Sequence, residues 1–195
     1  MSRSNANSED LQHTSVRSRV ALSALASLSA FVMGALAAAP PSDSASEATI
    51  KAAFVYNFAK FVEWQSAPAA GAPGEVKICT AGVDNDLAAT VAALEGKPVQ
   101  TRTVSVRRDV KTADLDICQV LLIGSGARAL AEAARGKAGL LTVSDIKGFA
   151  AAGGVIELFA EDGKMRFEIN TRAAQRAGLR ISSQLLKLAR VTPEQ

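Results

Sequence analysis

The pattern of apolar and polar positions is most distinctive in residues 50–64, which hold three of the seven phenylalanines, the only tyrosine and the only tryptophan. Phe54, Phe58 and Phe61 recur at i, i+4 and i+7, the spacing of one face of a helix. Residues 44–47 fit a capping box, in which a hydroxyl and a Glu satisfy free N–H groups at a helix start. The pattern predicts a helix whose aromatic stripe packs into a core, with a partner-binding or cofactor-binding face as the alternative.

The rest of the pattern predicts strands alternating with helices. Runs of apolar and β-branched residues indicate strands at 75–80, 98–106, 117–123, 140–143, 154–159 and 164–169. Helices are expected at about 84–94 and 126–135, and one or two more at 171–190. Residues 161–163 are a hairpin signal between the last two strands. This order indicates an α/β three-layer sandwich with a mostly parallel sheet and an antiparallel hairpin at one edge.

Two glycine turns at predicted strand ends are candidate anion or ligand sites. Gly124, Ser125 and Gly126 follow a buried strand and open a helix, so their free N–H groups could receive an anion. Gly82 and Asp84 occupy the same place after the first strand of the domain. Neither turn matches a phosphate-binding or dinucleotide-binding motif, and a plain tight turn is the simpler interpretation.

The N-terminal segment has the organisation of an export signal. Arg17 and Arg19 precede an apolar stretch at 20–37, and residues 35–37 supply a small-x-small cleavage pattern. The two arginines are not adjacent, so the general secretory route is favoured over the twin-arginine route. An uncleaved anchor is the alternative, because the stretch approaches the roughly 20 residues of a membrane span. We therefore expect a signal peptide at 1–37, a flexible linker at 38–44 and one domain at 45–195.

Cleavage would limit the chemistry available to the mature chain. The leader carries three of the 22 basic and two of the 19 acidic residues, which leaves a net charge of +2 and no nucleic-acid footprint. It also removes His13, the only histidine. Without histidine the chain forms neither a Ser-His-Asp or Cys-His pair nor a histidine-bearing zinc site, so no enzyme, cofactor or metal centre is expected.

The two cysteines, Cys79 and Cys118, are an even number in an exported chain, which most simply means one disulfide. Its loop of about 40 residues corresponds to roughly 4 kcal/mol of chain-entropy stabilisation. Two buried free thiols on neighbouring strands are the alternative. The spacing is not that of a Cys-x-x-Cys redox motif.

Aromatic and aliphatic side chains on the predicted first and last helices are the candidate partner-binding residues. They are Phe58, Phe61, Trp64, Ile181, Leu185 and Leu188. A basic stripe is also expected if the helix persists through Gly178, formed by Arg172, Arg176 and Arg180. Such a stripe would meet an acidic partner or lipid headgroups, although a solvated face is the simpler interpretation.

Several motifs in order resemble the YfiR family. They are residues 50–64, Cys79 followed by Gly82, residues 116–118, residues 141–145 with Phe149 and Gly153-Gly154, residues 166–170 and residues 178–189. The resemblance covers essentially the whole mature chain. It implies a periplasmic, Rossmann-like α/β protein without known catalysis, and it supports the Cys79–Cys118 pairing. Some relatives carry a second cysteine pair, which this chain lacks.

The resemblance also implies partners. The best understood relatives bind the periplasmic sensor region of an inner-membrane diguanylate cyclase and keep that enzyme inactive. An outer-membrane lipoprotein sequesters the repressor, whereupon cyclic di-GMP rises and favours biofilm, and a homodimer is implied as well. The alternative is a small-ligand-binding or sensing module at the strand-end glycine turns. Exposed apolar surface on the aromatic or terminal helix would favour a protein partner, whereas a cleft at the glycine turns would favour a ligand.

Overall fold

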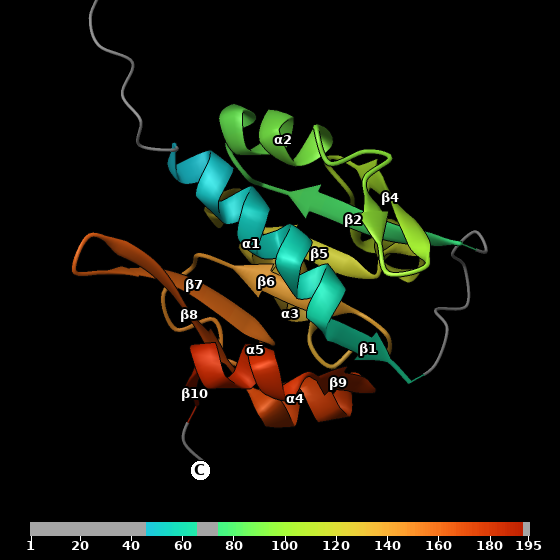
Figure 1. The fold of residues 1–195 in the computed structure, drawn as a ribbon. Coiled ribbons are helices and arrows are strands. Elements are labelled where there is room, and N and C mark those ends of the chain that lie inside the picture. The colour runs from blue at the N-terminus through green and yellow to red at the C-terminus, as the bar shows by residue number, and fades with distance from the viewer. Residues whose placement is uncertain (1–45, 66–73, 193–195) are drawn as a thin grey trace, which may run out of the picture. The chain divides into compact units, whose positions relative to one another are not determined.

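The computed structural model of the chain describes residues 46–65 and 74–192 (Figure 1). The expected signal peptide and linker, and Ser44 of the expected capping box, lie outside the described residues. Within the described ranges, none of the helices combines the length and the apolar character needed to cross a membrane.

An eight-stranded sheet forms the middle of the domain. Its strands, in spatial order, are β10 (Arg190–Val191), β8 (Lys164–Ile169), β7 (Ile156–Glu161), β6 (Leu141–Ser144), β5 (Val120–Ile123), β2 (Glu75–Ala81), β4 (Arg102–Arg107) and β3 (Pro98–Val99). The central strands from β7 to β4 are parallel, and β7 and β8 form an antiparallel hairpin, as predicted. Two features were not predicted. Strand β10 extends the sheet beyond the hairpin, and β3 adds an antiparallel strand at the opposite edge, because a turn at Gln100 divides the expected strand at 98–106.

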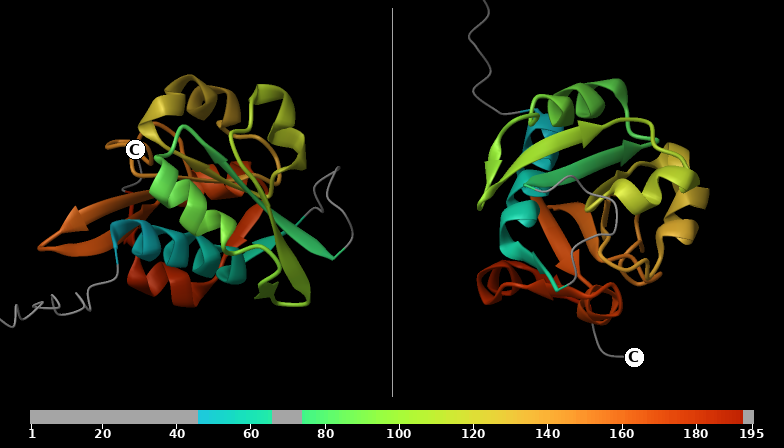
Figure 2. Two further views of the ribbon diagram at one scale, coloured as in Figure 1. Left: turned by 90° about the horizontal axis from the view of Figure 1, so that it is seen from above. Right: turned by 90° about the vertical axis from the view of Figure 1, so that its right-hand side faces the viewer.

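Helices cover both faces of this sheet (Figure 2). One face carries α1 (Glu47–Phe61) and α2 (Asn85–Ala92), with α4 (Thr171–Arg176) and α5 (Ser183–Leu188) packed into the same core. The other face carries α3 (Arg128–Ala134) and the 3₁₀ helices η1 (Thr112–Ile117) and η2 (Ser125–Ala127). The fold is therefore a mixed α/β domain with a mostly parallel sheet.

Strand β5 shows how the sequence divides the core into two layers. Val120 and Leu122 point into the larger core beneath α1 and α2, whereas Leu121 and Ile123 point into the smaller core beneath α3. Successive side chains of a strand face opposite sides of a sheet, so a run of four apolar residues is buried on both faces. This explains why the run reads as continuously apolar in the sequence.

Helix α1 begins two residues later than the expected capping box indicates, and it ends earlier than the sequence predicted. Its N-cap is Ser46, whose Oγ accepts a hydrogen bond of 3.2 Å from the Thr49 amide. The helix ends at Phe61, and the chain continues as the short strand β1 (Val62–Trp64). This strand pairs antiparallel with β9 (Leu179–Ile181) in a separate two-stranded sheet. Backbone pairing with a distant segment therefore ends the helix before the tryptophan.

The continuous C-terminal helix that would carry a basic stripe is not formed. Helix α4 stops at Arg176, and Gly178 adopts a left-handed φ of 68°, which favours glycine. The chain then enters β9 before α5 begins at Ser183. Arg180 and Ile181 consequently lie on a strand. Arg180 therefore shares no helical face with the two other arginines of the expected stripe, and Ile181 shares none with the leucines of α5.

Candidate functional site

The exposed large apolar side chains of the described residues lie at the end of α1 and on the C-terminal segment. We call the surface of α4, β9, α5 and β10, together with Phe61, the C-terminal surface. Three large apolar side chains of the described residues are exposed, and all belong to it: Phe61 at 37%, Leu188 at 73% and Val191 at 44%. Exposed apolar side chains that gather in one region are typical of protein-binding surfaces.

A pocket with a volume of about 260 Å³ lies between α4, β9 and α5. Its apolar lining comes from Ala174, Leu179, Ile181 and Leu186, and its polar lining from Gln65, Thr171, Gln175 and Arg180. A pocket lined by both apolar and polar groups suits an inserted side chain or a small organic ligand.

The β1–β9 ladder holds the end of α1 beside the C-terminal segment. Val62 lies opposite Ile181, and the Ser182 amide donates a hydrogen bond of 3.0 Å to the Phe61 carbonyl. The indole Nε1 of Trp64 donates to the Gly139 carbonyl at 3.0 Å, so this half-buried ring is fixed in place. The structure therefore brings together Phe61, Trp64 and Ile181, which the sequence assigned to two separate helices.

Two of the predicted partner-binding residues belong to the core instead. Phe58 is 0% exposed, and its ring lies edge-on to that of Phe167 with centroids 5.1 Å apart. Leu185 is 4% exposed and lies on the buried side of α5. The prediction was wrong for both, because the helical spacing identified an apolar face but not which of its members the neighbouring elements cover. Sequence reasoning also missed Leu179 and Ala174, which line the pocket. The two residues meet there because the chain breaks after α4 and continues as β9.

The two glycine turns pack against each other and do not form an open anion cradle. The Gly124 amide donates to the Ala81 carbonyl at 2.9 Å, and the Gly126 amide donates to the Gly82 carbonyl at 3.1 Å. A Cβ on Gly124 would lie 2.2 Å from the Gly82 oxygen, so the two backbones are in direct contact. The amides of Gly124 and Gly126 therefore already have partners. Ser125, between these glycines, is exposed and begins η2.

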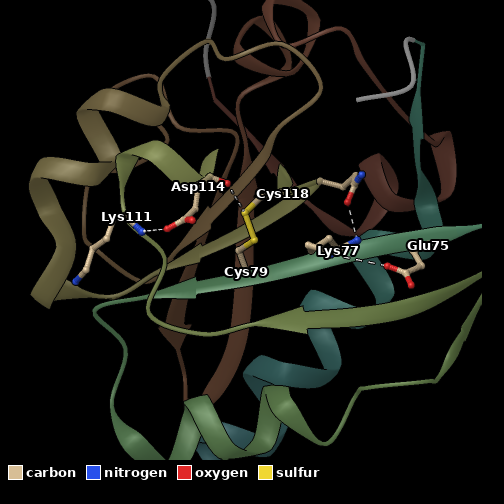
Figure 3. The surroundings of a disulfide bond; sticks show 7 residues. Glu75, Lys77, Cys79, Lys111, Asp114 and Cys118 are labelled. Atoms are coloured by element: carbon tan, nitrogen blue, oxygen red, sulfur yellow. Dashed lines mark hydrogen bonds and ion pairs between the residues drawn. A yellow bond between two sulfur atoms is a disulfide. The ribbon is translucent and has the colours of Figure 1, made fainter. Parts of the chain in front are cut away.

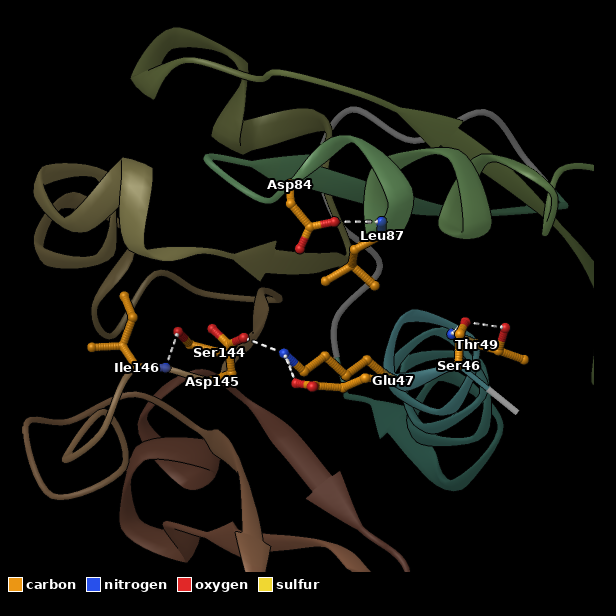
Figure 4. Close-up of polar contacts among 9 residues, drawn as sticks. Ser46, Glu47, Thr49, Asp84, Leu87, Ser144, Asp145 and Ile146 are labelled. Atoms are coloured by element: carbon orange, nitrogen blue, oxygen red, sulfur yellow. Dashed lines mark hydrogen bonds and ion pairs between the residues drawn. The ribbon is translucent and has the colours of Figure 1, made fainter. Parts of the chain in front are cut away.

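Asp84 is the N-cap of α2, and its Oδ1 accepts a hydrogen bond of 2.8 Å from the Leu87 amide (Figure 4). It also lines a second pocket, of about 540 Å³, between the first turns of α1 and α2. Glu47, Asp86 and Lys51 line the same pocket. This end of the domain is acidic, because Lys51 is the one cation in the lining and it is already paired.

Lys51 holds α1 to the end of β6. Its Nζ lies 2.5 Å from Asp145 Oδ2 and 2.7 Å from Glu47 Oε1, and the residue is 8% exposed (Figure 4). Burial alone would lower the pKa of Lys51, but the hydrogen bonds to Asp145 and Glu47 outweigh it and hold the pKa above its ordinary value. The charge is therefore stable at neutral pH and its role is structural.

The predicted disulfide is present between Cys79 of β2 and Cys118, which precedes β5 (Figure 3). The two Cα atoms are 5.8 Å apart, and the residues are 0% and 2% exposed. The bond joins β2 to the end of η1, two residues before the neighbouring parallel strand β5. Its burial makes it a structural bridge.

Among residues 46–65 and 74–192, no group of three or more His, Cys, Asp or Glu side chains is placed to hold a metal ion. A search of curated proteins finds no match to the sequence. A family model described as YfiR/HmsC-like matches residues 48–190, which is most of the chain and nearly all of its described part. The chain belongs to the YfiR/HmsC-like family.

Proposed function

We propose that the protein is a periplasmic regulator that binds the sensor region of an inner-membrane diguanylate cyclase and keeps the enzyme inactive, which lowers cyclic di-GMP. Membership of the YfiR/HmsC-like family supports this regulatory role over catalysis. The buried disulfide supports an oxidising compartment such as the periplasm.

The observation that carries the proposal is the C-terminal surface. It holds the three exposed large apolar side chains of the described residues: Leu188 at 73%, Val191 at 44% and Phe61 at 37%. Interfaces derive most of their affinity from a few buried apolar or aromatic anchors with pockets between them. The pocket between α4, β9 and α5 would receive such an anchor from the partner.

Inhibition would operate by population shift. The regulator binds the inactive conformation of the sensor region more tightly than the active one, and the ratio of the two affinities sets the extent of inhibition. An outer-membrane lipoprotein that occupied the same surface would withdraw the regulator and release the cyclase. A homodimer built on this surface would compete in the same way.

The small-ligand alternative at the glycine turns has less support, because the amides of Gly124 and Gly126 are already hydrogen-bonded.

Cellular cyclic di-GMP in a deletion strain tests the proposal, with the gene restored as wild type, as Leu188→Asp or as Ala133→Asp. Ala133 is an exposed residue near the C-terminus of α3, so it matches Leu188 in helical position and in the charge introduced. We expect deletion to raise cyclic di-GMP, and wild type and Ala133→Asp to lower it again, while Leu188→Asp does not. An unchanged level on deletion under several growth conditions would refute the regulatory role. Full restoration by Leu188→Asp would refute the surface.

A further inference from the structure

The C-terminal segment carries charge of one sign. Residues 171–192 contain five basic residues and no Asp or Glu: Arg172, Arg176, Arg180, Lys187 and Arg190. The opposite end of the domain, where α1 and α2 begin, exposes the carboxylates of Glu47, Asp84 and Asp86 around its pocket. Figure 1 shows α2 and the start of α1 at one end of the domain and α4 and α5 at the other. The charges are therefore separated across the domain.

Three of the C-terminal cations have no partner among the described residues. Arg176, Arg180 and Lys187 are exposed, and no ion pair, hydrogen bond or ring contact involves their side chains. Arg190 differs, because it pairs with Glu161 at 2.5 Å. Glu63 is the nearest acidic residue by register, since it lies opposite Arg180 across the β1–β9 ladder, but the two side chains do not form an ion pair.

One of the three unpaired cations lines the pocket, and the other two are neighbours in sequence of residues that line it. Arg180 lines the pocket directly, while Arg176 follows the lining residue Gln175 and Lys187 follows the lining residue Leu186. A guanidinium at the edge of an apolar pocket favours a carboxylate, which it binds through two parallel hydrogen bonds. The arrangement therefore combines a place for an apolar side chain with positive charge around it.

We infer that the C-terminal surface recognises a protein segment that presents one apolar anchor side chain flanked by carboxylates. The inference rests on the proposed function and specifies the chemistry of the partner's contact region. A bilayer of anionic lipid offers the same charge, but its flat headgroup layer does not fill a recessed pocket, so the pocket favours a protein. The acidic opposite end would repel the same partner and so orient the encounter.

The test measures association of the full mature chain with the purified periplasmic sensor region of the inner-membrane diguanylate cyclase whose own deletion abolishes the rise in cyclic di-GMP seen in the first deletion strain. The variant is Arg180→Glu/Lys187→Glu, and the control is Arg107→Glu/Arg108→Glu, which makes the same change in net charge at exposed residues of and beside β4. We expect the association rate to fall about tenfold or more for the variant and about twofold or less for the control. The wild-type rate should also fall steeply as salt rises from about 0.05 M to about 0.5 M, and the variant's rate should fall less.

Each other outcome counts against the inference in a distinguishable way. Wild-type binding that the variant leaves unchanged, or that both double variants weaken equally, overturns the acidic-partner inference and leaves the proposed function standing. Absence of wild-type binding overturns both. Wild-type binding to phosphatidylglycerol vesicles that the variant abolishes, with binding to the sensor region unaffected, identifies a membrane surface as the partner and overturns the inference. A thermal melt of each variant confirms that the domain is folded.

Discussion

Lys51 is the single charged member of the buried residues of α1, and replacing it tests how much one ion pair contributes to the docking of that helix. The substitution Lys51→Met keeps an apolar stem of similar length and removes the ammonium group. It leaves the carboxylates of Asp145 and Glu47 without their partner. We expect the folded state to lose stability, because both carboxylates lose a charge-assisted hydrogen bond.

The magnitude follows from the exposure of the three groups. Breaking a fully buried ion pair costs about 3–5 kcal/mol. Here the side chain of Lys51 is 10% exposed, but those of Asp145 and Glu47 are 35% and 70% exposed, so water replaces part of the lost interaction. We therefore expect the free energy of unfolding to fall by about 1–2 kcal/mol, with a fall in Tm of about 3–6 °C for a domain of this size.

Urea unfolding followed by tryptophan fluorescence measures this change. Trp64 is the only tryptophan, and it is half-buried and hydrogen-bonded to Gly139, so its emission reports on the folded domain. Lys147→Met is the matched control, because Lys147 is exposed and has no ion pair among the described residues. The control should stay within about 0.5 kcal/mol of wild type.

The pH dependence supplies a second readout. The pKa of Lys51 is raised above its ordinary value of 10.5 in the folded state, so the folded chain holds this proton more tightly than the unfolded chain. The contribution of the ion pair is therefore fully present below pH 10.5 and is lost as the pH rises through the folded-state pKa. The stability difference between wild type and Lys51→Met should be constant near neutral pH and shrink above about pH 10.5. A variant as stable as wild type at pH 7 would refute the reasoning.

Three further predictions concern stability. The double variant Cys79→Ala/Cys118→Ala should lose about 3–4 kcal/mol of unfolding free energy in urea, and adding a reductant should then have no further effect on it. Gly124→Ala should lower Tm by several degrees, because its Cβ would lie 2.2 Å from the backbone oxygen of Gly82. Leu185→Ala should cost about 2–4 kcal/mol, whereas Leu188→Ala should stay within about 0.5 kcal/mol of wild type in the same urea titration.

Each of these has an outcome that would contradict it. A cysteine-free variant as stable as the oxidised wild type would mean that the disulfide adds nothing to the fold. Gly136 has a positive φ of 69° and open space around its Cβ position, so Gly136→Ala separates backbone strain from collision. A larger loss at Gly136 than at Gly124 would refute the close packing of the two glycine turns. Equal losses at the two leucines would contradict their different burial.

Local signals in the sequence predicted the sheet and its hairpin well. Asp162 and Gly163 both adopt positive φ values, 51° and 71°, which a two-residue turn between antiparallel strands requires and which this pair of residues accommodates. The alternation between apolar runs and glycine turns likewise located β2, β5 and β6. These features depend on a few neighbouring residues, and neighbouring residues are what a sequence pattern records.

The candidate site was predicted less well, because it depends on contacts between distant parts of the chain. Nothing near Val62 indicates that it pairs with Ile181, and without that pairing residues 62–64 read as a continuation of α1. Gly178 did carry a usable signal, since a glycine after a short helix commonly marks its end. Reading it that way would have placed Ile181 outside the helix and revealed the break that forms the pocket.

The β1–β9 pairing also has a consequence for the order in which the molecule is completed. Cys79 and Cys118 both precede β6, so their disulfide can form between segments that lie earlier in the sequence than β9. Within the described residues β1 pairs with β9 alone, and β9 lies close to the end of the chain. The end of α1 therefore has no neighbouring strand until residues 179–181 have formed β9. A folding intermediate that lacked the β1–β9 pairing would contain the disulfide but would leave the end of α1 without its neighbouring strand.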